Sequence, residues 1–224
     1  MKILFFGRKN DEYSIKLLKI LRKKFTNVKV FWSQKYNEKL PKNLKNWKGD
    51  LIFSFRNYLI LPKSLIKNTK IAAINFHPGP PKYRGVGCLN YAIFNNEKFY
   101  GVTAHQINSK IDNGSILKVK RFKINQKDDL TKLLNKTHKE LFFLALQTIN
   151  LIKKKIDLKK LAIISKKEKW SKKINNKKDL DNFYRISKFI KKKDLIKKIR
   201  STYTKKFKPY LIIHGKRFIY EKQK

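Results

Sequence analysis

The stretch Lys2-Ile3-Leu4-Phe5-Phe6-Gly7 decides the fold, because a short apolar run that ends at a glycine is typical of a strand buried on both faces. An amphipathic helix is predicted directly after it, over Asp11–Lys24, and the residues expected on its apolar side are Ile15, Leu17, Leu18, Ile20 and Leu21. A strand followed by a helix is the repeating unit of α/β proteins with a parallel sheet.

The pattern continues through the first two thirds of the chain. Further strands are predicted over Val28–Trp32, Leu51–Phe55, Ile71–Phe76, Gly101–Ile107 and Ser115–Ile124, and a long helix over Leu130–Lys153. We therefore expect an α/β fold, with a Rossmann-like, mainly parallel sheet flanked by helices, in a domain that spans residues 1–155.

Residues 156–224 form the predicted C-terminal extension. The stretch Lys153–Lys178 is rich in Lys and Asn and is interpreted as a solvated connection, followed by short helices over Leu180–Ile190 and Asp194–Arg200. A β-hairpin is predicted over Tyr210–Tyr220, with a turn at His214-Gly215. Because an isolated hairpin is marginally stable, it should pack on the domain or on a second subunit, and a homodimer is expected.

Length, charge and cysteine content narrow the function classes. A chain of 224 residues holds one full domain with a modest appendage. The net charge of +42 suggests a polyanion partner such as tRNA, DNA or anionic lipid, but only 8 of the 57 basic residues are Arg, the better phosphate ligand. We interpret the Lys excess as compositional bias on a solvated surface. The single Cys88, the lack of a signal peptide and a longest apolar stretch of only about a dozen residues predict a cytoplasmic protein without a membrane span.

One of the four histidines stands at a position typical of a ligand site. His77 follows Asn75 at the end of a predicted parallel strand, and ligand sites in open α/β sheets lie outside such ends. Residues two apart on a strand share a face, so an amide donor and an imidazole can form an oxyanion clamp with a general base. The alternative, a histidine that only binds loop backbone groups, stays open. His138 and His214 are expected on the surface, and His105 is expected to be structural.

Three motifs in order resemble the signature of the folate-dependent formyltransferases. They are Asn75-Phe76-His77-Pro78-Gly79-Pro80-Pro81-Lys82-Tyr83-Arg84-Gly85, Gly101-Val102-Thr103 and Asp112-Asn113-Gly114-Ser115-Ile116-Leu117. The resemblance covers roughly residues 50 to 120. The loop after His77 is one residue shorter than is usual in that family, so we expect a changed wall on the acceptor side.

The resemblance implies 10-formyltetrahydrofolate as the formyl donor and an amine as the acceptor. Asn75 and His77 would stabilise the oxyanion, while His77 or Asp112 would take a proton from the amine. Asp112 would also orient His77, and no metal is needed. The implied pterin-binding residues are Tyr58, Leu59, Ile60, Lys110, Ile111 and Asp112, and simple strand-end packing is the alternative for Tyr58–Pro62. Arg84 and Gly85 are expected on the acceptor side, where Arg84 would meet a pyrophosphate.

The length of the chain decides between acceptors. Methionyl-tRNA formyltransferases carry a complete second β-barrel, for which too little chain remains after residue 160, whereas sugar N-formyltransferases often carry a short tail of helices and a hairpin. The layout therefore implies a dTDP- or UDP-linked 4-amino or 3-amino deoxysugar, used in surface polysaccharide biosynthesis. A methionyl-tRNA formyltransferase-like enzyme is the first alternative, and a non-catalytic polyanion-binding relative is the second.

Overall fold

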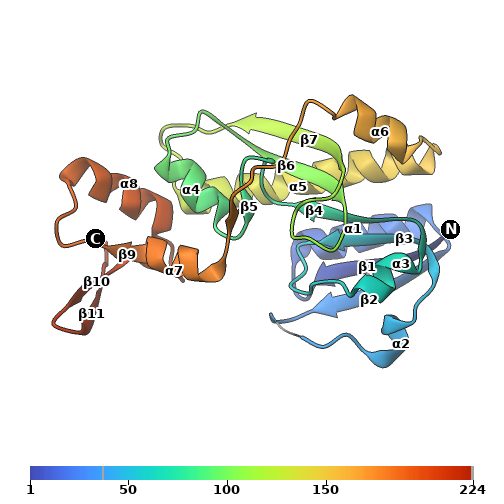
Figure 1. The fold of residues 1–224 in the computed structure, drawn as a ribbon, viewed down its shortest axis with the longest axis horizontal. Helices are drawn as coiled ribbons and strands as arrows, with labels where there is room; N and C mark the ends of the chain where they lie inside the picture. Colours follow the sequence, from blue (N-terminus) through green and yellow to red (C-terminus); the bar gives the residue numbers. More distant parts are fainter. Residues whose placement is uncertain (37, 223–224) are drawn as a thin grey trace.

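The computed structural model describes residues 1–36 and 38–222 (Figure 1). Its elements are β1 (Lys2–Arg8), α1 (Glu12–Lys24), β2 (Asn27–Ser33), α2 (Lys42–Lys45), β3 (Gly49–Phe55), α3 (Lys63–Lys67), β4 (Thr69–His77), β5 (Arg84–Gly85), α4 (Cys88–Phe94), β6 (Phe99–Gln106), β7 (Ile116–Lys123), α5 (Leu130–Lys153), α6 (Leu158–Ile164), β8 (Ile174–Asn175), α7 (Lys177–Tyr184), β9 (Arg185–Ile186), α8 (Lys192–Thr202), β10 (Tyr210–Ile213) and β11 (Lys216–Ile219).

A six-stranded sheet forms the centre of the molecule, with strand order β2-β1-β3-β4-β6-β7. The first four strands pair in parallel, and β6 and β7 are added antiparallel at one side. The predicted fold class, a mainly parallel sheet flanked by helices with a short helical and hairpin extension, is confirmed.

Alternate residues of β1 face two different apolar layers. Ile3 and Phe5 pack in a cluster with side chains of α1 and α5, whereas Leu4 and Phe6 pack in a second cluster with side chains of α2 and α3. All four are fully buried, as a strand covered on both faces requires. A third cluster lies beneath α4 and includes Tyr83 and Cys88. It supports the loop that follows β4.

The extension departs from its prediction at two places. The helix expected over Leu180–Ile190 is wrong in its second half: α7 begins after a capping box at Asn176 and ends at Tyr184, and Arg185–Ile186 instead pairs with β10. The stretch Lys153–Lys178 is more than a solvated connection, because it contains α6 and a strand, β8, that pairs with β5.

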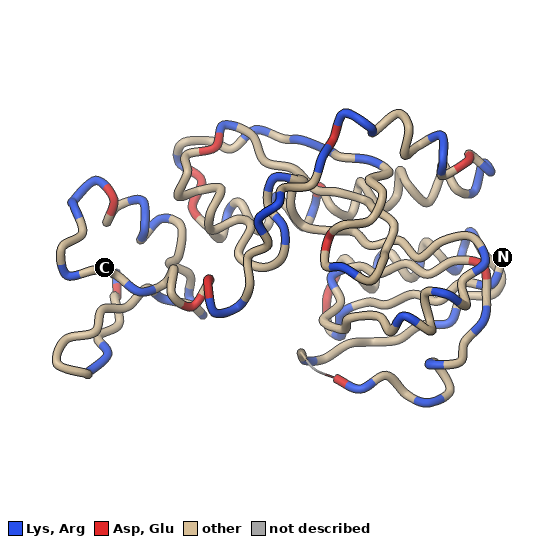
Figure 2. Tube along the Cα trace, in the orientation of Figure 1, with Lys and Arg blue, Asp and Glu red and all other residues tan. Residues whose placement is uncertain are grey.

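The predicted hairpin is confirmed in β10 and β11, which form a three-stranded sheet with β9. His214 and Gly215 both adopt positive φ, as a two-residue turn that matches the strand twist requires. Lys and Arg occur along the elements of residues 1–155 and of residues 156–222 alike (Figure 2). Among the described residues, no helix combines the length and the apolar character that a membrane span needs.

Candidate active site

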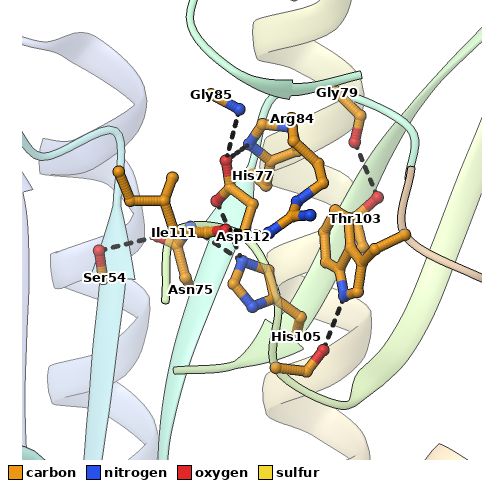
Figure 3. Close-up of polar contacts among 12 residues, drawn as sticks. Ser54, Asn75, His77, Gly79, Arg84, Gly85, Thr103, His105, Ile111 and Asp112 are labelled. Carbon is orange, nitrogen blue, oxygen red and sulfur yellow. Dashed lines mark hydrogen bonds and ion pairs between the residues drawn. The ribbon is translucent and has the colours of Figure 1, made fainter. Parts of the chain in front are cut away.

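The candidate site lies at the carboxyl end of β4, where Asn75 and His77 close the last parallel strand (Figure 3). The neighbouring strand β6 places His105 opposite Asn75 and Thr103 opposite His77. The Thr103 hydroxyl donates to the Gly79 carbonyl over 2.7 Å and so holds the loop that follows His77. Two strands from different parts of the sequence therefore fix the polar groups of the site.

Asp112 lies between two imidazoles. Its Oδ2 is 3.3 Å from His77 Nδ1, and its Oδ1 is 3.5 Å from His105 Nε2. The backbone N–H of Gly85 donates to Oδ2 over 2.9 Å. Burial alone would raise the pKa of Asp112, but the attraction of His77 and His105 in their charged forms and the hydrogen bond from Gly85 outweigh it and hold the pKa well below its usual range. The carboxylate is therefore ionised.

His77 has an oxygen atom facing each of its ring nitrogens. Nε2 donates to the Tyr83 carbonyl over 2.8 Å, and Nδ1 faces Asp112. Burial lowers the pKa of His77, opposed by the Asp112 carboxylate and the Tyr83 carbonyl. A neutral ring can donate to only one of these oxygens, and a second proton would find an acceptor already in place. Burial therefore disfavours the charged ring, while the two oxygen atoms that face it favour the charged form.

His105, which the sequence analysis took as structural, belongs to this cluster. Its Nδ1–H donates to the Gln106 carbonyl over 2.7 Å, which leaves Nε2 as the acceptor in the neutral ring. Nε2 lies 3.2 Å from Asn75 Nδ2 and also faces Asp112. The available signal was the strand alternation that puts Thr103 and His105 on one face, but the pairing of that face with β4 is not visible in the sequence.

The amide of Asn75 is oriented by the neighbouring strand. Asn57 Nδ2 donates to the Ser54 hydroxyl over 2.7 Å, and that hydroxyl donates to Asn75 Oδ1 over 2.9 Å. The amide N–H groups of Asn75 are thereby turned toward His105. A preset donor of this kind is what a developing oxyanion needs.

Arg84 and Gly85 lie in the site as structural contacts. The Arg84 side chain is buried, and its guanidinium donates to the carbonyls of Ser171 and Ile111 over 2.8 and 2.7 Å. Gly85 has a positive φ and lies so close to Asn175 that a Cβ would stand 2.1 Å from that carbonyl oxygen. Direct contact of either residue with an acceptor remains a prediction.

The residues proposed for the pterin lie on two loops beside the cluster. Tyr58 is held by an N–H hydrogen bond to Ser33 Oγ and by the Arg8 guanidinium, 4.1 Å from the ring centre. Leu59 is partly buried against the second apolar cluster, Lys110 is exposed, and Ile60 and Ile111 expose 79% and 52% of their surface. Contact of these residues with a pterin ring remains a prediction.

The expectation for His138 is wrong, and that for His214 is confirmed. His214 is exposed in the hairpin turn. His138 is partly buried beside a buried ion pair of Arg56 with Asp11. Burial, assisted by the repulsion of Arg56, lowers its pKa to about 3.

Trp170, which lies in the stretch expected to be a solvated connection, contacts the site. The Trp170 ring centre lies 5.9 Å from that of His77 and 5.0 Å from that of His105, in edge-to-face geometry. No sequence motif marks this residue. Among residues 1–36 and 38–222, no group of three or more His, Cys, Asp or Glu side chains is arranged to hold a metal ion.

Comparison with known sequences agrees with this geometry. The family model described as formyl transferase matches residues 7–149. The bifunctional polymyxin resistance protein ArnA of Wigglesworthia glossinidia brevipalpis is 42% identical over 106 residues, 43% of this chain and 16% of that protein. A methionyl-tRNA formyltransferase of Wolbachia pipientis is 33% identical over 115 residues, 51% of this chain and 38% of that protein.

Solved structures match over nearly the whole chain. A 4-N formyltransferase from Francisella tularensis superposes with a TM-score of 0.74 at 20% identity, over 98% of this chain and 96% of that one. An N-formyltransferase from Helicobacter canadensis, in complex with folinic acid and dTDP-3-aminofucose, superposes with a TM-score of 0.69 at 20% identity, over 96% and 85%.

The fold is a Rossmann-like sheet in which Asn75, His77 and Asp112 gather at the end of a central strand. Because the family model covers well over half of its residues, the chain belongs to the formyl transferase family. It spans less than half the length of the curated relatives named above.

Proposed function

We propose that this protein is an N-formyltransferase that moves the formyl group of 10-formyltetrahydrofolate to the amine of a nucleotide-linked amino deoxysugar. The observation that carries the proposal is the Asp112 carboxylate, held between His77 and His105 beside the oriented amide of Asn75. This arrangement offers an oxyanion donor and a proton acceptor within a few ångströms of each other.

The reaction assigns one task to each side chain. The amine nitrogen forms a bond to the formyl carbon, and the Asn75 amide donates to the oxygen that becomes negative. The amine proton passes to His77 or Asp112, which face each other over 3.3 Å, and the Tyr83 carbonyl accepts from the other ring nitrogen of His77. The bond from the formyl carbon to N10 of the folate then breaks, and the same pair returns the proton to N10. Residues 58–60 and 110–112 would hold the pterin ring.

The layout of the chain supports a sugar nucleotide as the acceptor. The solved N-formyltransferase structures superpose over the C-terminal extension as well as the main sheet, and one of them is in complex with folinic acid and dTDP-3-aminofucose. The acceptor would be a dTDP- or UDP-linked 4-amino or 3-amino sugar destined for surface polysaccharide. The enzyme would act in the cytoplasm as a homodimer built through the extension.

A panel assay tests this proposal. The protein is incubated with 10-formyltetrahydrofolate and dTDP- and UDP-linked amino sugars, and mass spectrometry detects the added formyl group. Transfer to one sugar, lost in Asp112→Asn, is the expected result. No transfer to any sugar, with formylation of methionyl-tRNA, would overturn the acceptor.

Methionyl-tRNA is the second candidate acceptor, favoured by the curated relatives and by the net charge of +42. It predicts tRNA binding that weakens steeply as salt is raised. A non-catalytic relative would be identified by two results together: the parent transfers no formyl group, and His77→Ala binds a polyanion as well as the parent does.

A further inference from the structure

The segment from Trp170 to Asn175 crosses both loops that carry the candidate catalytic residues. Its Ser171 N–H donates to the Pro81 carbonyl over 2.9 Å, and the Ser171 carbonyl accepts from Arg84. Farther along, β8 pairs with β5, and the Val86 N–H donates to the Asn175 carbonyl over 3.0 Å. The segment is therefore fixed along its length to the loop that follows His77.

The indole of Trp170 reaches the second loop. Its Nε1–H donates to the Gly114 carbonyl over 2.8 Å, two residues beyond Asp112. Gly114 itself packs so closely on the end of β6 that a Cβ would stand 1.8 Å from the Gln106 carbonyl oxygen. The hydrogen bond from Trp170 thus holds the Asp112 loop against the strand that carries His105.

The same indole packs edge-to-face with both imidazoles. Both rings are almost completely buried, with 3% exposure each. An aromatic ring in this position excludes water and limits rotation of the two imidazoles.

We propose that Trp170 is a positioning residue of the catalytic centre, which keeps the two imidazoles and the Asp112 loop in register for proton transfer. This inference rests on the proposed function. It means that the catalytic centre is incomplete without the C-terminal extension, even though its reacting groups all come from the main domain.

The contact with Trp170 also affects the titration of His77. The groups that face His77 are Asp112, His105, Arg84 and Cys88, together with the Tyr83 carbonyl. Burial is the largest influence on the ring, and it lowers the pKa of His77. Removing the indole admits water, so the midpoint of the His77 titration should rise.

The test uses the full chain and three variants. Trp170→Ala removes the indole, Trp170→Phe keeps an aromatic ring without the N–H, and Trp47→Phe is the matched control. Trp47 is buried in the second apolar cluster, and its Nε1 has no hydrogen-bond partner among the described residues. Imidazole NMR follows the four histidines against pH, and formyl transfer from 10-formyltetrahydrofolate gives kcat and KM.

Trp170→Ala should raise the His77 midpoint and lower kcat about 10- to 100-fold with a smaller change in KM, as expected for displaced catalytic groups. Trp170→Phe should fall between Trp170→Ala and the parent, and Trp47→Phe should stay within about twofold of the parent. A folded Trp170→Ala with the parent's midpoint and kcat would overturn the inference. If Trp170→Ala does not fold, a Trp170→Phe variant with the parent's His77 midpoint and kcat would overturn the inference. If the parent transfers no formyl group, the proposed function is wrong. The NMR midpoints of His77 would then still show whether Trp170 positions the imidazoles.

Discussion

Residues 1–155 and residues 156–224 are held together in different ways. The first region buries large apolar side chains on both faces of its sheet. In the described part of the second region, Leu158 is the one large apolar side chain that is buried, and the other buried residues are Asn175, Ser201, Thr202 and Pro209. The extension depends on hydrogen bonds and aromatic contacts with the first region. A change in composition therefore marks where a core ends, but the active site continues beyond it.

Truncation should produce the largest effect. A chain ending at Lys155 lacks Trp170, Ser171 and the strand that pairs with β5, so we expect formyl transfer to fall at least about 100-fold. A chain ending at Thr204 keeps that segment and loses only the hairpin, and it should remain within a few-fold of the parent. Activity assays together with circular dichroism check both. A fully active chain of residues 1–155 would show that the active site does not depend on residues 156–224.

The next largest effect concerns the carboxylate inside the main domain. Asp112→Asn keeps the shape but removes the charge between the imidazoles, and kcat should fall about 10²- to 10⁴-fold, the range for loss of acid–base catalysis. His105→Gln keeps a polar group opposite Asn75 and should lose less.

Single-turnover measurements of formyl transfer separate these variants from defects in binding. If His105→Gln loses as much activity as Asp112→Asn, then His105 and Asp112 act as one unit.

Two glycines allow the contact between the regions, where β5 pairs with β8, to be compared with the turn of the hairpin. Gly85 and Gly215 have φ of +79° and +75°, but only Gly85 is packed, against Asn175. Gly215→Ala should lower the free energy of unfolding by about 1–2 kcal/mol through backbone strain alone. Gly85→Ala adds a steric clash and should lower it by about 3 kcal/mol or more. Urea unfolding measures the free energy of unfolding of both variants. Equal decreases would show that the contact of Gly85 with Asn175 does not stabilise the fold.

The last prediction concerns His138, whose effect on stability vanishes at neutral pH and grows only as the pH falls. Its pKa in the folded chain is about 3, below the usual value near 6.5, so the unfolded chain binds a proton that the folded chain does not. Stability should therefore fall as the pH drops from about 6.5 toward about 3, by at most about 1.4 kcal/mol per pH unit from this group.

His138→Gln cannot titrate and should flatten that slope in urea unfolding between pH 7 and pH 4. His77, whose pKa is also lowered by burial, should supply a residual slope of the same sign. An unchanged slope would mean that His138 is accessible to water.

The sequence predicted the elements that depend on local patterns. The strand at β1, the helices α1 and α5 and the hairpin turn follow from side-chain periodicity and turn chemistry, which act over a few residues. The second half of the helix expected over Leu180–Ile190 failed because Arg185–Ile186 pairs with β10, a contact that is distant in sequence.

The sequence by itself determined the α/β fold class and brought Asn75, His77 and Asp112 forward as candidates. Only the tertiary structure decided that His105 lies opposite Asn75 and that Trp170 packs on both imidazoles. The physical reason is that strand register and the path of the extension are set by contacts between residues far apart in the chain. A periodic pattern identifies which side chains share a face, but it does not identify what that face meets.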